Sequence, residues 1–304
     1  MEILKAAVLG TVQGLTEFFP VSSSGHLVIT PFILKWDYIP VYYTVLLHFA
    51  TLLSLVTVFY RQIWRIIKHF FSGIFIAGYR KTAYFKLALF IIIATVPAVA
   101  AGLFLGDFVE GFFSNPLYVA AFLLVTSFFL FAGEFSAKRK ERKQKPGSSS
   151  SNDFEKSLVS KDAPLQANSP VNKKTPGYLI AFITGIGQAV AIFPGISRSG
   201  ATISFARFFG IKREACVKFS MLMSIPVIFG AFIFELPAVF EAANTGLHYS
   251  VSGLITGFLF SYLSGLFAIK FLVKISQRRN FNFFALYCIL LSALIFTLVF
   301  VRKL

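Results

Sequence analysis

The stretch QGLTEFFPVSSSGH occupies residues 13–26 and interrupts an otherwise apolar N-terminal segment. The apolar run 3–19 stops at Pro20, and a second short apolar run follows at 27–34. Proline ends or kinks a helix, and irregular backbone is tolerated at membrane depth only where protein or a watery cavity surrounds it. Helix, break and helix therefore predict a re-entrant hairpin over residues 3–34.

A second stretch, FPGISRSGATIS at 193–204, breaks another apolar segment in the same way. The apolar runs 178–193 and 201–209 flank it and predict a second hairpin over 178–210. When the chain is aligned with itself at a shift of 175 residues, without gaps, six of sixteen positions are identical. The matching residues are Gly10, Gln13, Phe18, Ser22, Ser24 and Gly25 in the first copy, and Gly185, Gln188, Phe193, Ser197, Ser199 and Gly200 in the second.

The composition is that of an integral membrane protein. Of the 304 residues, 56% are hydrophobic and 14% are charged, a balance that excludes a soluble domain of this length. A helix crosses a bilayer with about 20 apolar residues, and six further stretches are long enough. These stretches are 41–60, 87–106, 117–136, 215–235, 250–272 and 282–301. The predicted fold class is therefore an all-α integral membrane protein.

Basic residues orient the predicted helices. The four segments 61–86, 138–176, 212–218 and 273–280 carry 22 Lys and Arg, against four at the two chain ends. The positive-inside rule places these segments in the cytoplasm, which accounts for the net charge of +16 without nucleic-acid binding. Each hairpin is followed by three spans, an odd number, so the second repeat is predicted to be inverted relative to the first.

The predicted organisation has three parts. Residues 1–137 form the first repeat, and residues 177–304 form the second, inverted repeat. Residues 138–176 between them are a basic, Ser-rich cytoplasmic linker, which we expect to be disordered because it is poor in apolar residues. Inverted repeats of this kind place their binding site near the middle of the membrane, where two broken helices face each other.

Glu17 is a candidate functional residue because a carboxylate inside a membrane is costly and is retained for a purpose. Gln13 lies four residues earlier and shares its helix face. The structural alternative for Glu17 is a hydrogen bond to a neighbouring helix, and its surroundings favour function. A divalent cation, Mg²⁺ or Ca²⁺, held by Glu17 and a diphosphate would fit, since Mg²⁺ often binds through one carboxylate plus phosphates.

Small polar residues follow both breaks. Ser22, Ser23 and Ser24 can cap the second half-helix of the first hairpin, or leave its N–H groups for an anion. His26 lies three residues after Ser23, so the two side chains can meet on a helix, which is a hydrolytic arrangement. The residues predicted to bind substrate are Gln13, Ser22, Ser24, Gly25, Ser197, Ser199 and Gly200.

Arg198 is the least ambiguous residue, because it lies in an intramembrane break between two serines. A buried guanidinium needs an anion, and its fork matches the oxygens of a phosphate. An ion pair with Glu17 is the alternative, and the same side chain can serve both purposes in turn. His48 could border the site, but we expect it to be a packed residue.

These residues resemble the two signature motifs of the undecaprenyl-diphosphate phosphatase family, also called the bacitracin-resistance family. The resemblance covers nearly the whole chain apart from the linker, and it implies hydrolysis of undecaprenyl diphosphate to undecaprenyl phosphate with Mg²⁺ or Ca²⁺. It implies catalytic roles for Glu17, Ser23, His26 and Arg198. Two departures are Gln13, where relatives commonly have Glu, and His48, where relatives often have Gln.

Two other functions remain open at this stage. A lipid-phosphate transporter or flippase could share the inverted-repeat architecture. A lipid phosphatase of the acid-phosphatase superfamily is disfavoured because its Lys–Arg-Pro and His-x3-Asp motifs are absent from the sequence. The expected location is the bacterial inner (plasma) membrane, with a site open to the extracytoplasmic side. The expected partners are a polyprenyl diphosphate lipid and the membrane, and a homodimer is left open.

Overall fold

A computed structural model describes residues 2–37, 39–143, 153–159, 176–245 and 249–303. Within these ranges all the regular elements are helices. They are α1 (Glu2–Phe18), α2 (Ser23–Leu34), α3 (Val41–Phe75), α4 (Ala77–Arg80), α5 (Ala83–Glu110), the 3-10 helix η1 (Gly111–Ser114), α6 (Pro116–Lys143), α7 (Asp153–Val159), α8 (Gly177–Val190), α9 (Arg198–Arg207), α10 (Arg213–Thr245), α11 (Val251–Ser276) and α12 (Asn282–Lys303).

The prediction of six long apolar helices is confirmed. Among the described residues, α3, α5, α6, α10, α11 and α12 are long and apolar enough to cross a membrane. Large apolar side chains cover the outer surface of these helices, for example Phe104, Phe234 and Phe283, which are 84%, 74% and 71% exposed. Such a surface is stable against lipid and unstable against water. The protein is therefore a multi-pass membrane protein.

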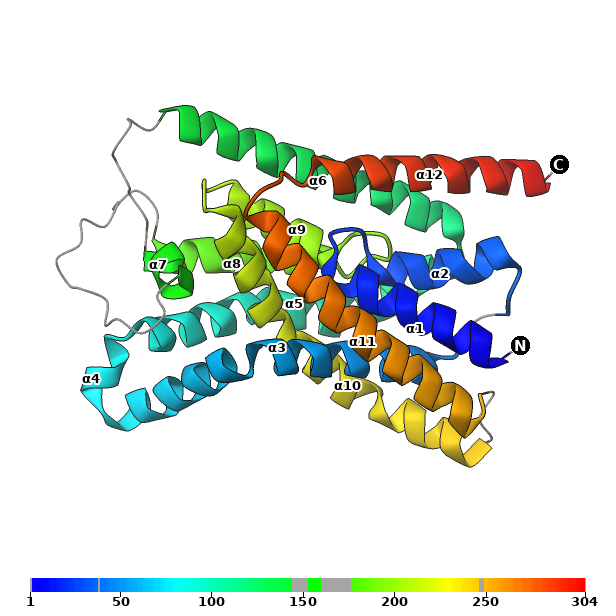
Figure 1. Ribbon diagram of the computed structural model, residues 1–304, viewed down its shortest axis with the longest axis horizontal. Coiled ribbons are helices and arrows are strands. Elements are labelled where there is room, and N and C mark those ends of the chain that lie inside the picture. The colour runs from blue at the N-terminus through cyan, green and yellow to red at the C-terminus, as the bar shows by residue number, and fades with distance from the viewer. Residues whose placement is uncertain (1, 38, 144–152, 160–175, 246–248, 304) are drawn as a thin grey trace.

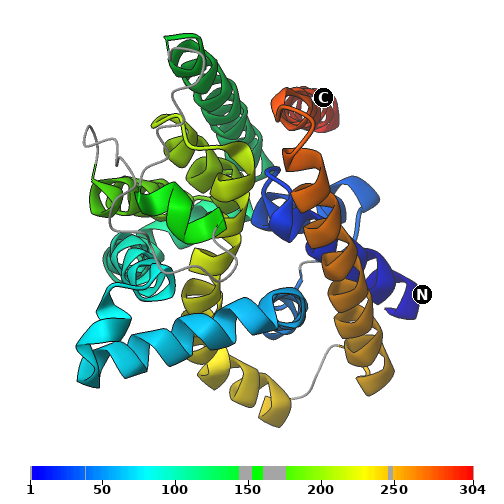
Figure 2. The same cartoon turned by 60° about the vertical axis from the view of Figure 1, so that its left-hand side comes forward.

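Two short helical hairpins lie inside this set of helices. In Figure 1, α1 and α2 occupy one half of the molecule, α8 and α9 occupy the other, and their breaks face each other near the middle. Figure 2 shows the same arrangement from the side, with α10 and α11 passing beside the hairpins. Each hairpin is followed by three long helices, in the order that the repeat predicts. The inverted relation of the two halves stays a prediction.

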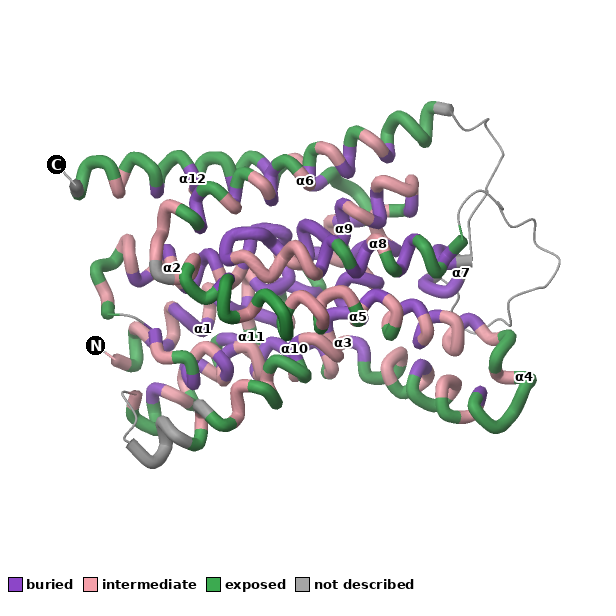
Figure 3. The backbone as a smooth tube through the Cα atoms, turned by 180° about the vertical axis from the view of Figure 1, so that it is seen from behind, coloured by how far each residue is buried: buried purple, intermediate pink, exposed green. Residues whose placement is uncertain are grey.

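The buried residues gather around the two breaks. Figure 3 shows this buried backbone at the centre and exposed backbone along α12 and the far end of α6. Glycines allow α1 and α11 to approach closely, because a Cβ on Gly14 would meet the Ser261 carbonyl and would lie 2.7 Å from the backbone nitrogen of Gly265. The first half of the first hairpin is thus fixed to α11 by backbone proximity.

Gly14→Ala is expected to lower the stability of the protein by about 1–3 kcal/mol, the usual cost of overpacking. The added methyl group meets backbone of α11, which cannot rotate away. The measurement is the apparent Tm of the purified protein in detergent. Gly102→Ala in α5 is the control, because no atom of another helix lies within 4 Å of its Cβ position. Equal Tm values for the two variants would contradict the close packing of α1 on α11.

The expectation of a disordered linker over 138–176 is wrong in two places. Helix α6 continues to Lys143, and α7 forms from Asp153 to Val159. The reason for α7 is apolar burial: Phe154 and Leu158, four residues apart, are 0% and 4% exposed and pack in the main core. The rest of the predicted linker, 144–152 and 160–175, lies outside the described residues.

Candidate active site

The first break is built around Ser22. Its side-chain oxygen caps α2 by accepting from the Gly25 N–H at 3.3 Å, and it also accepts from the Gly195 N–H of the second break at 3.2 Å. Ser22 has φ 72°, a left-handed conformation that is uncommon and strained for a residue with a side chain. Strain of this kind persists only where surrounding contacts hold it, and here both breaks supply them.

The second break repeats the same cap. Ser197 accepts from the Gly200 N–H at 3.1 Å, as Ser22 does from Gly25. Thr126 of α6 secures the turn, because its hydroxyl donates to the Gly195 carbonyl and accepts from the Ser197 N–H, both at 2.8 Å. Gly195 has φ 105°, and a Cβ there would meet the backbone of Val119, so only glycine fits.

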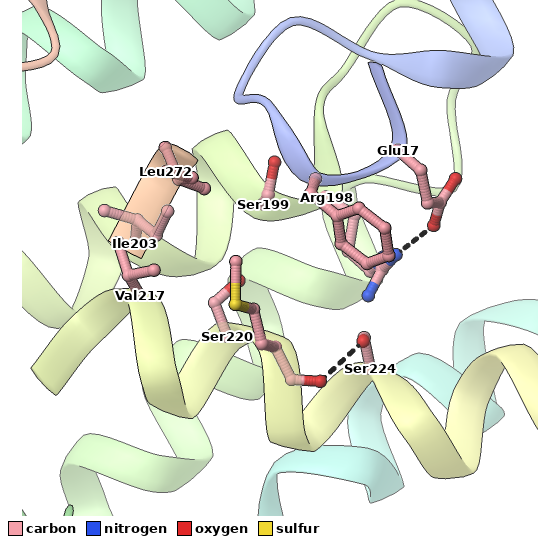
Figure 4. Close-up of a pocket in the computed structure, with 10 residues that line it drawn as sticks. Glu17, Arg198, Ser199, Ile203, Val217, Ser220, Ser224 and Leu272 are labelled. Carbon is pink, nitrogen blue, oxygen red and sulfur yellow. Dashed lines mark hydrogen bonds and ion pairs between the residues drawn. The ribbon is translucent and has the colours of Figure 1, made fainter. Parts of the chain in front are cut away.

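The two breaks meet directly. The Ser199 hydroxyl donates to the Phe19 carbonyl at 3.1 Å, and the Arg198 guanidinium donates to Oε1 of Glu17. Figure 4 shows Arg198 reaching toward Glu17 from the second hairpin. Glu17 is 6% exposed and the Arg198 side chain is 18% exposed, so a partly buried guanidinium meets a buried carboxylate between the hairpins. The predicted encounter of the two breaks is therefore present in the structure.

Glu17 is the centre of the polar contacts. Its Oε2 accepts from the Ser23 hydroxyl at 2.7 Å and from Nε2 of Gln13 at 2.9 Å. The Gln13 contact follows from the four-residue spacing on α1. Gln13 is fully buried, and its own amide oxygen has no hydrogen-bond partner among the described residues. A carboxylate that accepts from a serine hydroxyl is placed to take its proton.

Among the described residues, the His26 ring makes its hydrogen bonds to partners other than Ser23. Its Nδ1 lies 2.7 Å from the Ser22 carbonyl, and its Nε2 lies 2.7 Å from the hydroxyl of Tyr287 in α12. Because a carbonyl only accepts, Nδ1 carries a proton, and the neutral ring accepts from Tyr287 through Nε2. Glu17, and not His26, is therefore the acceptor within reach of the Ser23 hydroxyl in this arrangement.

Tyr287 and Thr126 escaped the sequence prediction, and His48 was considered as a residue that borders the site but was expected to be packed. Tyr287 is 261 residues from His26 in the chain. Its only sequence signal is the face of α12 that it shares with Phe284 and Cys288. On that face, Phe284 packs on Phe19, and Cys288 lies against the Pro20 carbonyl. His48, expected to be packed, is instead 28% exposed, with its Nε2 3.5 Å from Oε2 of Glu17. An imidazole in a membrane helix was the available signal for His48.

A small cavity of about 10 Å³ adjoins the ion pair, the room that one water molecule needs. Figure 4 shows it between Glu17, Arg198 and the α10 residues Ser220 and Ser224. The Ser220 hydroxyl lies 2.7 Å from that of Thr202. The α10 serines extend the polar lining beyond the two motifs.

The two hairpins carry complementary chemistry. At the shift of 175 residues, Ile192 stands at the position of Glu17, Arg198 at that of Ser23 and Ala201 at that of His26. Each hairpin therefore has its own serine cap. The carboxylate and the hydroxyl come from the first hairpin only, and the guanidinium comes from the second hairpin only. Neither hairpin alone holds a complete set.

A divalent cation fits this set of residues in part. No cluster of three or more His, Cys, Asp or Glu exists among the described residues, so there is no cage made by protein alone. Glu17 supplies a carboxylate, and the unpartnered amide oxygen of Gln13 supplies a neutral oxygen. One carboxylate completed by phosphate oxygens is a usual Mg²⁺ environment.

Comparison with known proteins decides the family. The family model described as "Bacitracin resistance protein BacA" matches residues 6–294. The chain belongs to the BacA family. It is similar to a protein of Korarchaeum cryptofilum named undecaprenyl-diphosphatase, with 36% identity over 98% of this chain and 100% of the relative. Proteins of the same name from Alkaliphilus metalliredigens and Christiangramia forsetii are 37% and 35% identical over 94% and 97% of this chain.

Both breaks lie inside the region that the BacA model matches, and so does every residue of the site described above. The match also includes His48 and Tyr287, which the two sequence motifs do not contain. The resemblance found in the motifs alone is thus confirmed over nearly the whole chain.

Proposed function

We propose that this protein hydrolyses undecaprenyl diphosphate to undecaprenyl phosphate and inorganic phosphate, which returns the lipid carrier to cell-wall synthesis. The observation that carries the proposal is the cluster of Glu17, Ser23 and Arg198 where the two breaks meet, which joins an acceptor, a hydroxyl and a phosphate-binding fork. Undecaprenyl-diphosphatase is also the name of relatives that match nearly the whole chain.

Substrate binding depends on positive charge at the two breaks. Arg198 turns its fork from Glu17 to the diphosphate, since guanidinium groups bind phosphate oxygens in pairs. The first N–H groups of α2 and α9 have no partners within their helices, and the helix dipoles add positive potential there. The isoprenoid chain stays among the apolar outer faces of the helices.

The chemical step uses the contact between Ser23 and Glu17. Glu17 takes the proton of Ser23, or of a water that Ser23 orients, and the oxygen attacks the terminal phosphorus. The bond from that phosphorus to the bridging oxygen breaks, and undecaprenyl phosphate leaves as a stable anion. Attack by water gives inorganic phosphate directly, whereas attack by Ser23 gives a phosphoserine that a water then cleaves to release inorganic phosphate and restore the hydroxyl. Arg198 offsets the charge on the equatorial oxygens, which is the main form of catalysis in phosphoryl transfer.

His26 supports this step indirectly, through its hydrogen bond to Tyr287. The Tyr287 hydroxyl fixes the ring of His26, and with it the first turn of α2. Tyr287→Phe is expected to lower kcat by up to about tenfold, the size of one lost hydrogen bond, with KM nearly unchanged. Steady-state phosphate release measures both constants. Tyr178→Phe is the control, because Tyr178 is on α8, where its ring contacts Phe90. Equal kcat values for Tyr287→Phe and Tyr178→Phe would contradict the role of Tyr287.

A divalent cation, Mg²⁺ or Ca²⁺, completes the proposed site, with Glu17 and the amide oxygen of Gln13 as its protein ligands. When bound, the ion neutralises charge on the diphosphate. Removal of divalent cations with EDTA is expected to abolish phosphate release, and added Mg²⁺ or Ca²⁺ is expected to restore it. Full activity in excess chelator would contradict a cation requirement.

The competing function is lipid-phosphate transport. Purified protein in liposomes containing undecaprenyl diphosphate distinguishes the two, because the phosphatase releases inorganic phosphate, whereas a flippase moves the lipid between leaflets without release. The contact between Ser23 and Glu17 favours the phosphatase, since transport needs no nucleophile. We further propose the bacterial inner membrane, with the site open to its extracytoplasmic side, on the basis of the basic loops.

A further inference from the structure

His48 has an unusual position beside Glu17. It lies on α3, outside both breaks, and its Nε2 is 3.5 Å from Oε2 of Glu17. That separation is longer than an N–H···O hydrogen bond, which spans about 2.7–3.2 Å. The side chain is 28% exposed, so the position can be reached from outside the core.

The orientation of the His48 ring is fixed by its other nitrogen. Nδ1 lies 2.8 Å from the Thr44 carbonyl, one turn earlier on α3. Since the carbonyl only accepts, Nδ1 carries a proton, which leaves Nε2 as the ring nitrogen on the side of Glu17. Histidines that bind metals are oriented in this way, with the other ring N–H donating to a backbone carbonyl.

The distances also suit a shared ion. Metal–ligand bonds of about 2.0–2.2 Å place neighbouring ligand atoms of one ion roughly 3.0–3.5 Å apart. The observed 3.5 Å between Nε2 of His48 and Oε2 of Glu17 is within that range. Gln13 shares the same carboxylate oxygen through its Nε2, and its buried amide oxygen is without a hydrogen-bond partner in the described part of the chain.

We propose that His48 is a metal ligand, and that its imidazole, Glu17 and Gln13 form a mixed nitrogen and oxygen site for a first-row divalent ion. Imidazole suits transition ions such as Fe²⁺ and Zn²⁺, whereas oxygen ligands suit Mg²⁺, Ca²⁺ and Mn²⁺. The imidazole of His48 therefore shifts the preference of the site from Mg²⁺ toward transition ions, and Mn²⁺, at the weak end of that series, is the paramagnetic probe for it. This inference rests on the proposed function only for the presence of a cation at Glu17.

The test is Mn²⁺ binding to the full-length protein in detergent after removal of metals, followed by EPR. Wild type is expected to bind Mn²⁺ with a nitrogen coupling in the pulsed spectrum, and Mg²⁺ is expected to compete weakly. His48→Gln is expected to lose the coupling and to weaken Mn²⁺ binding at least tenfold, because even indirect ligand support is worth about 10–100-fold. His69→Gln is the control, since His69 lies far along α3 and contacts Thr82.

Bound Mn²⁺ without nitrogen coupling in wild type, or equal Mn²⁺ affinity in His48→Gln, would overturn the proposal and leave an ion pair between His48 and Glu17. Phosphate release from undecaprenyl diphosphate with Mg²⁺ is measured on the same samples. If wild type releases phosphate but shows no nitrogen coupling to Mn²⁺, only the role of His48 is contradicted. If wild type shows nitrogen coupling but releases no phosphate, only the phosphatase function is contradicted. The apparent Tm of His48→Gln shows that the variant is folded.

Discussion

Arg198→Lys is expected to release phosphate from undecaprenyl diphosphate at least about 100-fold more slowly than wild type, the usual effect of removing one preorganised donor to a developing negative charge. Lysine keeps the positive charge and the ion pair with Glu17, but it lacks the planar fork that binds two phosphate oxygens. The loss is therefore expected mainly in kcat, which steady-state phosphate release measures.

The matched control for this prediction is Arg207→Lys. Arg207 is at the other end of the same helix α9, is 2% exposed and donates to the Ile211 carbonyl at 2.7 Å. Its replacement is expected to lower the apparent Tm, because it also pairs with Glu134, and to leave turnover per folded molecule nearly unchanged. A similar fall in turnover for both variants would show that Arg198 matters only for packing.

Glu17→Gln is expected to reduce kcat on the order of 10³-fold, within the usual range for loss of a general base. The substitution keeps the shape of the side chain but removes the group that takes the Ser23 proton. It also removes the carboxylate from the proposed cation site. The measurements are phosphate release and divalent-cation affinity, and both are expected to fall.

Glu134→Gln is the control for Glu17→Gln, because it removes a buried carboxylate that lies outside the site. Glu134 is 3% exposed and is bonded to Arg213 at 2.7 Å, at the far end of α9 from the site. We expect this variant to be less stable and to keep both turnover and cation affinity. Wild-type turnover in Glu17→Gln would contradict the base role, whatever the behaviour of Glu134→Gln.

The sequence predicted the hairpins from local rules, and it offered the ion pair of Glu17 with Arg198 as the alternative to phosphate binding. A proline, a Ser/Gly cluster and a charge inside an apolar segment are visible without coordinates. The repeat then suggested which two breaks would meet. The caps Ser22 and Ser197 also follow from local sequence. The strain at Ser22 does not, because its φ of 72° is held by the contact with Gly195 of the other break.

The remaining site residues depend on long-range packing. Tyr287 and Thr126 contact the breaks from α12 and α6, and nothing near them in the sequence indicates which break they meet. The contact between Ser23 and His26, expected from helical spacing, is replaced by one between Ser23 and Glu17, since the His26 ring turns to Ser22 and Tyr287. Helix α7 was missed because only Phe154 and Leu158 mark it within a polar segment.

The central claim is that Glu17 and Arg198, from different hairpins, act on one substrate. A double-mutant cycle of Glu17→Gln and Arg198→Lys on kcat/KM for undecaprenyl diphosphate tests it most directly. Residues that act as a unit are not additive, so the double variant is predicted to be about as slow as the slower single variant. Losses that multiply, as for two independent sites, would contradict the account.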